Sequence, residues 1–133
     1  MSEPGAKLER CYLVYALAPD ELRPREANAA FNDWIADHGR GLVLCHDHFL
    51  GVRGGFAVFY IASEDEFARL HDPGPLNAWR VAIHPLVFSQ APSGFRAQIE
   101  FTLRTYRGTT LAEVEARETP ARRNWWRRRP HDE

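Results

Sequence analysis

Three side chains that could do chemistry are adjacent in this sequence: His46, Asp47 and His48. They lie in the apolar stretch 42–50, whose alternation is typical of a β-strand. Because residues two apart in a strand share a face, both imidazoles are expected to project to the same side, roughly 7 Å apart at Cα. Such a pair can hold a metal, or one histidine can act as an acid or base beside the other. We therefore name His46 and His48 as the candidate catalytic residues.

Two other interpretations of the histidine pair stay open. A metal would need a third ligand from elsewhere in the chain, and the candidates are His84, His71, Asp72 and Glu100. The pair could also serve only to keep an edge strand polar, which discourages aggregation. We expect neither a metal nor a cofactor. In a regular strand Cys45 shares a face with Asp47, so an inert thiol is expected rather than a Cys–His nucleophile.

The helices and strands that must position these histidines can be predicted from the periodicity of apolar residues and from the positions of glycine and proline, which mark turns and helix ends. The first half of the chain predicts a strand over 11–18, a helix over 24–38, strands over 42–50 and 56–62 joined by the Gly-rich turn 51–55, and a helix after Ser63 that ends at Leu70. Ser63 and Glu66 form a capping-box pattern at the start of that last helix.

The second half of the chain is predicted with more breaks, because prolines interrupt it. Its expected elements are a helical piece from Pro75 that ends at His84 and Pro85, a short strand over 86–90, a strand over 95–104 and a helix over 111–118. One face of the strand 95–104 would carry Arg96, Gln98, Glu100 and Arg104. That face could bind an anion, or its charges could simply pair across strands in water.

This order, β-α-β-β-α-β with an extra C-terminal strand and helix, predicts an α+β fold of the ferredoxin-like type. Its antiparallel sheet would have helices on one face only. Strands 11–18 and 56–62 are apolar on both faces, so the second face also needs a cover. A second copy of the chain is the simplest cover, and we expect a homodimer. The expected parts are a flexible N-terminus over 1–10, a ferredoxin-like domain over 11–106, and a C-terminal helix and tail over 107–133.

This arrangement resembles the dimeric α/β barrel superfamily. The resemblance is carried by CYLVYALA, LVLCHDHFL and GGFAVFYIA with the helices between them, and it covers roughly residues 11–106. The superfamily includes YCII-related proteins, antibiotic-biosynthesis monooxygenases, polyketide cyclases and darcynin-like proteins. It implies a dimer and a pocket that works on organic substrates without a cofactor. No family active-site motif aligns with this chain, and the segment from Leu111 onward departs from the family pattern.

A substrate pocket is expected between the helices and the sheet. Its predicted lining is Tyr12, Trp34, Tyr60, Trp79 and His84. The irregular segment 71–85 could form a wall or lid over that pocket, or its histidines could simply cap a helix. The resulting hypothesis is a small-molecule enzyme or binder that uses a pocket histidine as acid or base. The alternative is a non-enzymatic, dimeric interaction module.

The C-terminal tail supports that alternative. Residues 121–133 hold five arginines against two acidic residues, together with Trp125 and Trp126, although the net charge of the whole chain is −1. Arginine and tryptophan are typical interface anchors. Nucleic acid is not an expected partner, since this basic segment is short and attached to an acidic body. The sequence shows no membrane span and no apolar signal region, so we expect a cytoplasmic protein with free cysteines.

Overall fold

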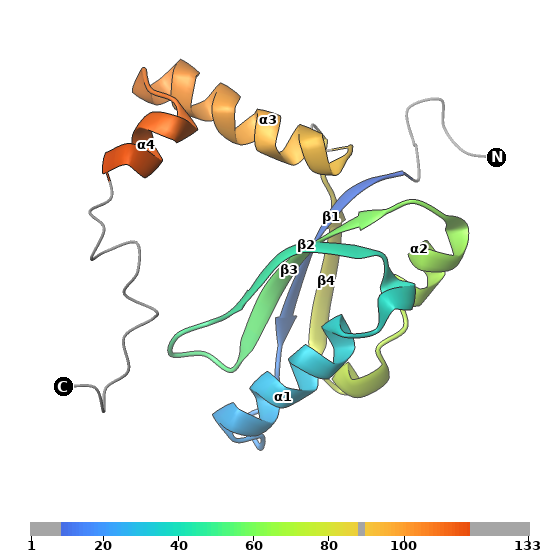
Figure 1. The fold of residues 1–133 in the computed structure, drawn as a ribbon. Helices are drawn as coiled ribbons and strands as arrows, with labels where there is room; N and C mark the ends of the chain where they lie inside the picture. The colour runs from blue at the N-terminus through green and yellow to red at the C-terminus, as the bar shows by residue number, and fades with distance from the viewer. Residues whose placement is uncertain (1–8, 88–89, 118–133) are drawn as a thin grey trace. The chain divides into compact units, whose positions relative to one another are not determined.

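The computed structural model describes residues 9–87 and 90–117 of the 133-residue chain. Its elements run in the order β1 (Arg10–Leu17), α1 (Pro24–Ile35), β2 (Leu42–His48), β3 (Gly54–Ile61), α2 (Glu64–Leu70), β4 (Arg80–Pro85), α3 (Pro92–Thr102) and α4 (Leu111–Arg117) (Figure 1). Two 3₁₀ turns, His38–Arg40 and Gly74–Leu76, and a π-helical turn, Leu103–Arg107, lie between them. The chain is therefore a mixed α+β protein, as the sequence predicts.

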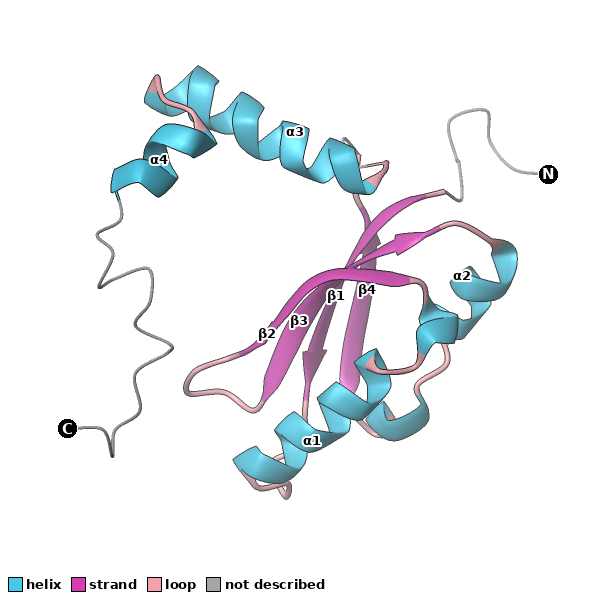
Figure 2. Cartoon of the chain, viewed as in Figure 1, coloured by secondary structure: helices cyan, strands magenta, loops and turns pink. Residues whose placement is uncertain are grey.

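The four strands form one antiparallel sheet in the order β2-β3-β1-β4 (Figure 2). The central strands β1 and β3 are the two predicted to be apolar on both faces, and β2 and β4 form the edges. The element order up to β4 and this strand order are compatible with a ferredoxin-like fold.

One face of the sheet packs against α1 and α2, and it carries the hydrophobic core. We call it the helix face. The strands contribute Tyr12, Val14, Ala16, Ala57, Phe59 and Ile61, and the helices contribute Phe31, Trp34, Ile35 and Leu70. Phe31, Trp34 and Ile35 recur at helical spacing and form one apolar stripe along α1. Burial of this stripe against the sheet fixes the position of α1. The N-cap Ser63 accepts a hydrogen bond from the Glu66 N–H, as the capping-box pattern predicts.

The opposite face of the sheet, which we call the open face, is also mainly apolar. Its residues, read from the strand register, include Leu13, Tyr15, Leu17, Leu42, Cys45, Phe56, Val58, Tyr60 and Ala82. Tyr15 is 44% exposed and Leu42 is 55% exposed. Rings gather at the end of this sheet nearest the hairpin, where Phe49 lies 5.5 Å from Tyr15 and 6.5 Å from Phe56.

A β-bulge interrupts the regular alternation of β2. The register skips one residue between Val43 and Cys45, so Leu44 has no partner in β3. Val43 therefore lies on the helix face with His46 and His48, whereas regular alternation places it with Cys45 and Asp47. The separation of Cys45 from the two histidines survives the bulge. Cys11 and Cys45 are both free, and burial raises the pKa of the Cys11 thiol.

Three predictions about the chain before residue 90 are wrong. The helix expected over 24–38 ends at Ile35, because the chain turns through the 3₁₀ segment His38–Arg40. The helical piece expected from Pro75 is only the 3₁₀ turn Gly74–Leu76, and the strand that follows is Arg80–Pro85 rather than 86–90. Because β4 is an edge strand that pairs only with β1, a proline at its last position costs no ladder hydrogen bond.

The extra C-terminal strand predicted over 95–104 is also wrong, since that segment is the helix α3. The helix predicted over 111–118 is confirmed as α4. The chain divides into two compact units, Met1–Phe95 and Arg96–Glu133. The predicted division into 1–10, 11–106 and 107–133 stays a prediction, and the Arg/Trp tail lies outside the described residues. Among the residues that the structure describes, none of the helices has the length and apolar character that a membrane span requires.

Candidate functional site

The edge strand β2 places His46 and His48 on the helix face, paired in register with Ala57 and Gly55 of β3. Their ring centroids are 6.4 Å apart and the ring planes are nearly perpendicular. His46 is exposed and His48 is half-buried. The two imidazoles thus project to the same side, as the strand alternation predicts, and one of them reaches toward the core.

The His48 ring sits in apolar surroundings. It makes an edge contact with the Phe31 ring, with centroids 5.8 Å apart. Its Nδ1 atom is buried, and no residue in the described part of the chain offers that atom a hydrogen-bond partner. Buried polar atoms in native structures nearly always have a hydrogen-bond partner. A partner for this Nδ1 atom is therefore expected.

An aromatic wall adjoins His48. The Phe31 ring is stacked between Trp34 at 6.1 Å and Trp79 at 6.3 Å. Gly55 makes room for this wall, because a Cβ added there would lie 2.9 Å from the Phe31 ring and 2.5 Å from the Asp47 carbonyl oxygen. A glycine at the second position of β3 is thus required by close approach rather than by a turn.

The five residues predicted to line the pocket fall on both sides of the sheet. Tyr12 and Trp34 are buried in the core on the helix face, and Trp79 packs against that core. Tyr60 and His84 lie on the open face, in register with Cys11 and Leu13 respectively. Within a single chain three of the five therefore share the helix face with the histidine pair, whereas Tyr60 and His84 lie on the other face, and the pocket itself stays a prediction.

The candidate third ligands for a metal are not gathered around the pair. His71 caps the C-terminus of α2, where its Nδ1 lies 2.8 Å from the Phe67 carbonyl oxygen, and Asp72 accepts a hydrogen bond from the Gly74 N–H at 3.2 Å. Glu100 lies in α3 and accepts one from the Leu111 N–H. Within residues 9–87 and 90–117, no group of three His, Cys, Asp or Glu side chains is arranged to hold a metal ion.

The irregular segment 71–79 is tied to the core. The Trp34 indole N–H donates to the Asp72 carbonyl oxygen at 3.2 Å, and Trp79 stacks on Phe31. Between them Ala78 has a φ of 77°, a left-handed conformation that alanine rarely adopts. His71 caps a helix, as one interpretation expects. The wall or lid over a pocket stays a prediction, with Trp79 stacked on the Phe31 ring that contacts His48.

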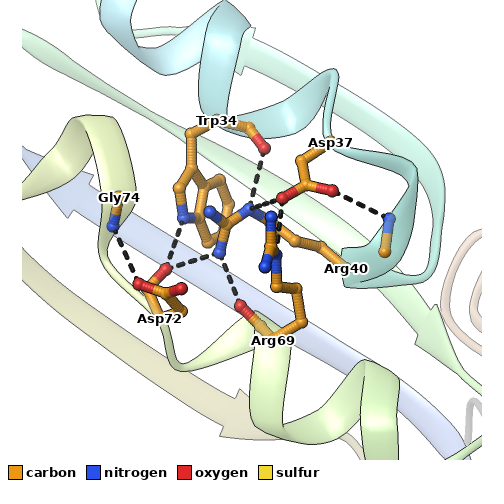
Figure 3. A network of polar contacts seen from close by, with 7 residues as sticks. Trp34, Asp37, Arg40, Arg69, Asp72 and Gly74 are labelled. Atoms are coloured by element: carbon orange, nitrogen blue, oxygen red, sulfur yellow. Dashed lines mark hydrogen bonds and ion pairs between the residues drawn. The ribbon is translucent and has the colours of Figure 1, made fainter.

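Sequence reasoning missed the most buried charge in the structure, Arg40, which is 2% exposed (Figure 3). Its Nε–H donates to the Trp34 carbonyl oxygen at 3.0 Å, and its Nη1 donates to the carbonyl oxygens of Arg69 and Asp72. The guanidinium also lies 4.7 Å from the centroid of the Trp34 ring. Arg40 therefore satisfies backbone carbonyls at the C-terminal ends of both α1 and α2, which have no partners within their helices.

Two further residues complete this cluster. The Asp37 carboxylate accepts hydrogen bonds from the Gly39 N–H at 3.0 Å and from Arg69 Nε at 2.7 Å, and it lies 3.7 Å from Arg40 Nε. The Arg69 hydrogen bond holds the pKa of Asp37 below its usual value, whereas burial lowers the pKa of Arg40. Gly74 leaves room for the guanidinium, since its φ is positive and a Cβ would lie 2.9 Å from Arg40 Nη2. The only sequence signal for Arg40 is a cation shortly after a helix C-terminus, which exposed arginines share.

Comparison with known proteins adds no family to this description. A scan against protein-family models finds no match, and a search of curated proteins finds no relative. The class that the structure defines is a small α+β domain with a four-stranded antiparallel sheet, compatible with a ferredoxin-like fold.

Proposed function

We propose that this protein is a homodimer of the dimeric α/β barrel type that binds a small organic molecule beside His48, without a cofactor. His48 is the group that exchanges a hydrogen bond or a proton with the ligand, and His46 assists it. The observation that carries the proposal is the buried Nδ1 atom of His48, which has no partner in the described part of the chain. A ligand atom would satisfy it in surroundings that exclude water, where such a bond is strong.

The surroundings of His48 indicate the kind of ligand. Phe31 is fully buried, so the half-buried Trp79 ring that stacks on it is the aromatic surface available to a ligand, and ring faces favour flat, conjugated molecules. A neighbouring imidazole at 6.4 Å can donate or accept a second hydrogen bond. A flat molecule with a hydroxyl or carboxyl group fits both features, and one histidine can move a proton on such a molecule without a metal.

The test uses ring nitrogens as reporters. Benzoate, phenol and indole are added as probes to the protein labelled with ¹⁵N, and the signals of the His48 imidazole and the Trp79 indole are followed. We expect a saturable shift of both signals in the wild type. In the variants only the Trp79 signal can be followed, and its shift is expected to be lost in His48→Ala and retained in part in His48→Gln. His38→Ala is the matched control, because His38 is exposed and lies in the turn before β2. Shifts that are absent, or that persist in His48→Ala, count against the site.

A second candidate is an interaction module in which the dimer itself is the function. The apolar open face favours it, because a bare apolar sheet face marks a surface that binds another protein. The basic Trp-containing tail would then bind a further partner. The same experiment separates the two candidates: a module of this kind leaves the His48 and Trp79 signals unchanged with every probe.

A further inference from the structure

The open face is apolar in the middle and charged at its two edges. One row across all four strands consists of Asp47, Phe56, Tyr15 and Ala82. On β4, Arg80 and His84 stand two residues to either side of Ala82 and face the same way, since they pair with Leu17 and Leu13. Among the paired strand positions of this face, Asp47 thus lies at the β2 edge, whereas Arg80 and His84 lie at the β4 edge.

These groups are available for contacts. Asp47, Arg80 and His84 are all exposed. One Asp47 carboxylate oxygen accepts a hydrogen bond from the His48 N–H at 2.8 Å, which leaves the other oxygen free to bind elsewhere. Neither Arg80 nor His84 has a side-chain hydrogen bond or ion pair with another residue in the described part of the chain.

We propose that a second copy of this chain docks on the open face about a two-fold axis parallel to the strands, so that Asp47 of each copy lies between Arg80 and His84 of its partner. This inference rests on the homodimer proposed above and adds its geometry. It gives Asp47 and His84 a role in assembly, on the face of the sheet away from His46 and His48.

Symmetry explains why this axis makes the face complementary to itself. A two-fold axis that runs along the strands between two stacked sheets exchanges the edges, so β2 lies over the partner's β4. Asp47 then faces the partner's Ala82, with the cationic edge about 7 Å away in each direction along the strand. Sheets stack about 10 Å apart, a gap that side chains from both faces fill, and the arginine side chain is long enough to close the offset.

The middle of the face agrees with the same axis. The exchange that sets β2 over β4 also sets β3 over the partner's β1. The half-buried Phe56 then packs over the partner's Tyr15, which is 44% exposed. The interface would thus have an apolar centre and a charged rim, which is the usual arrangement in protein interfaces.

The other face-to-face axis, perpendicular to the strands, is disfavoured by charge. It would set β2 over the partner's β2 and β4 over the partner's β4, and groups of like charge would then face one another. An unrelated protein would need its own acidic and basic edges at matching positions, whereas a second copy supplies both. These charges therefore favour a second copy as the occupant of this face.

Charge reversal tests the geometry. Single variants Asp47→Arg and Arg80→Asp each place like charges opposite one another twice per dimer, so each is expected to dimerise about tenfold more weakly than the wild type at low salt. An equimolar mixture of the two variants restores both pairs in one heterodimer. The double variant Asp47→Arg/Arg80→Asp restores them in a homodimer. Sedimentation velocity measures the dimer fraction in each case.

The matched controls are Asp33→Arg and Arg25→Asp, which make the same charge changes at exposed positions on α1. They are expected to dimerise as the wild type does, and circular dichroism checks that every variant is folded. If the wild type dimerises and the mixture forms no more dimer than the single variants do, the axis is wrong although the dimer stands. A wild type that stays monomeric overturns both the axis and the dimer.

Discussion

At the scale of single residues, Arg40 is the charge whose removal should cost the most. A buried charge loses its hydration, and only good geometry with several hydrogen bonds offsets that loss. Arg40 has both, since its planar guanidinium reaches three carbonyl oxygens and lies over the Trp34 ring. Removing it would take a charged donor from each of these carbonyl groups, and only the neutral N–H donors would remain, such as the Trp34 indole on the Asp72 oxygen.

We expect Arg40→Met to lower the free energy of unfolding by about 2–4 kcal/mol, because three carbonyl oxygens each lose a hydrogen bond from a charged donor at once. Arg40→Lys should lose less but still be destabilised, since a point charge cannot bridge two helix ends as a planar fork does. Urea denaturation followed by tryptophan fluorescence measures the free energy of unfolding of both variants. Arg25→Met, at an exposed position on α1, is the control and should change little. A stable Arg40→Met protein would show that the two helix ends find other donors.

At the scale of elements, the β2 edge strand decides what the His-Asp-His triplet can do. In the register of β2 with β3, the two histidines lie on the helix face and Asp47 lies on the open face. The bulge at Leu44 adds a residue without moving Cys45 onto the side of the histidines. The side chains of the triplet therefore lie on opposite faces of one strand rather than in one cluster.

Asp37 is the link between two elements, the turn before β2 and the helix α2. The Arg69 hydrogen bond lowers its pKa from 3.8 in the folded state. A group with a lowered folded pKa stabilises the protein above its unfolded pKa, and this contribution is lost as the pH falls through the folded pKa. We expect Asp37→Asn to be less stable than the wild type at neutral pH, with a difference that shrinks below about pH 4.

Urea denaturation at several pH values between neutral and acid measures this difference. Asparagine keeps an oxygen that can accept from the Gly39 N–H, so the variant removes mainly the charge. Asp33→Asn on α1 provides the comparison, since Asp33 is exposed and makes no such link. A difference that stays constant with pH would mean that the Asp37 charge is not what joins the two elements.

At the scale of the whole molecule, the sequence predicts the sheet better than the segments after it. The strands β1, β2 and β3 and the helices α1 and α2 are strongly apolar or carry a clear cap, and each lies close to its predicted place. Pro85 accounts for the wrong prediction of β4, because a proline after an apolar helical pattern predicts the end of a helix. At the last position of an edge strand it is tolerated.

The segment 95–104 shows the limit of periodicity. Its apolar residues alternate strictly, as in a strand, yet it is helical. The residues Ala97, Gln98 and Glu100 favour a helix by intrinsic propensity, and alternation alone does not outweigh that preference.

The candidate site was predictable only in part. Spacing predicts that His46 and His48 share a face, and the structure places them so. Which face Tyr60 and His84 occupy depends on the register of neighbouring strands, and no local pattern contains that information. The cluster around Arg40 joins residues more than thirty positions apart, so it becomes visible only in the folded chain.

The alternation in α3 has a consequence for how long its hydrogen bonds last. Because its apolar residues are spread around the helix, none of the residues of α3 or α4 is buried, and Phe101 stays 48% exposed. Helices this short are marginal without burial. Their amide protons should therefore exchange with deuterium through local opening, orders of magnitude faster than those of β1 and β3, which should exchange only when the sheet unfolds. Equal protection in the two sets, measured by mass spectrometry, would show that α3 and α4 are stabilised by a contact outside the described residues.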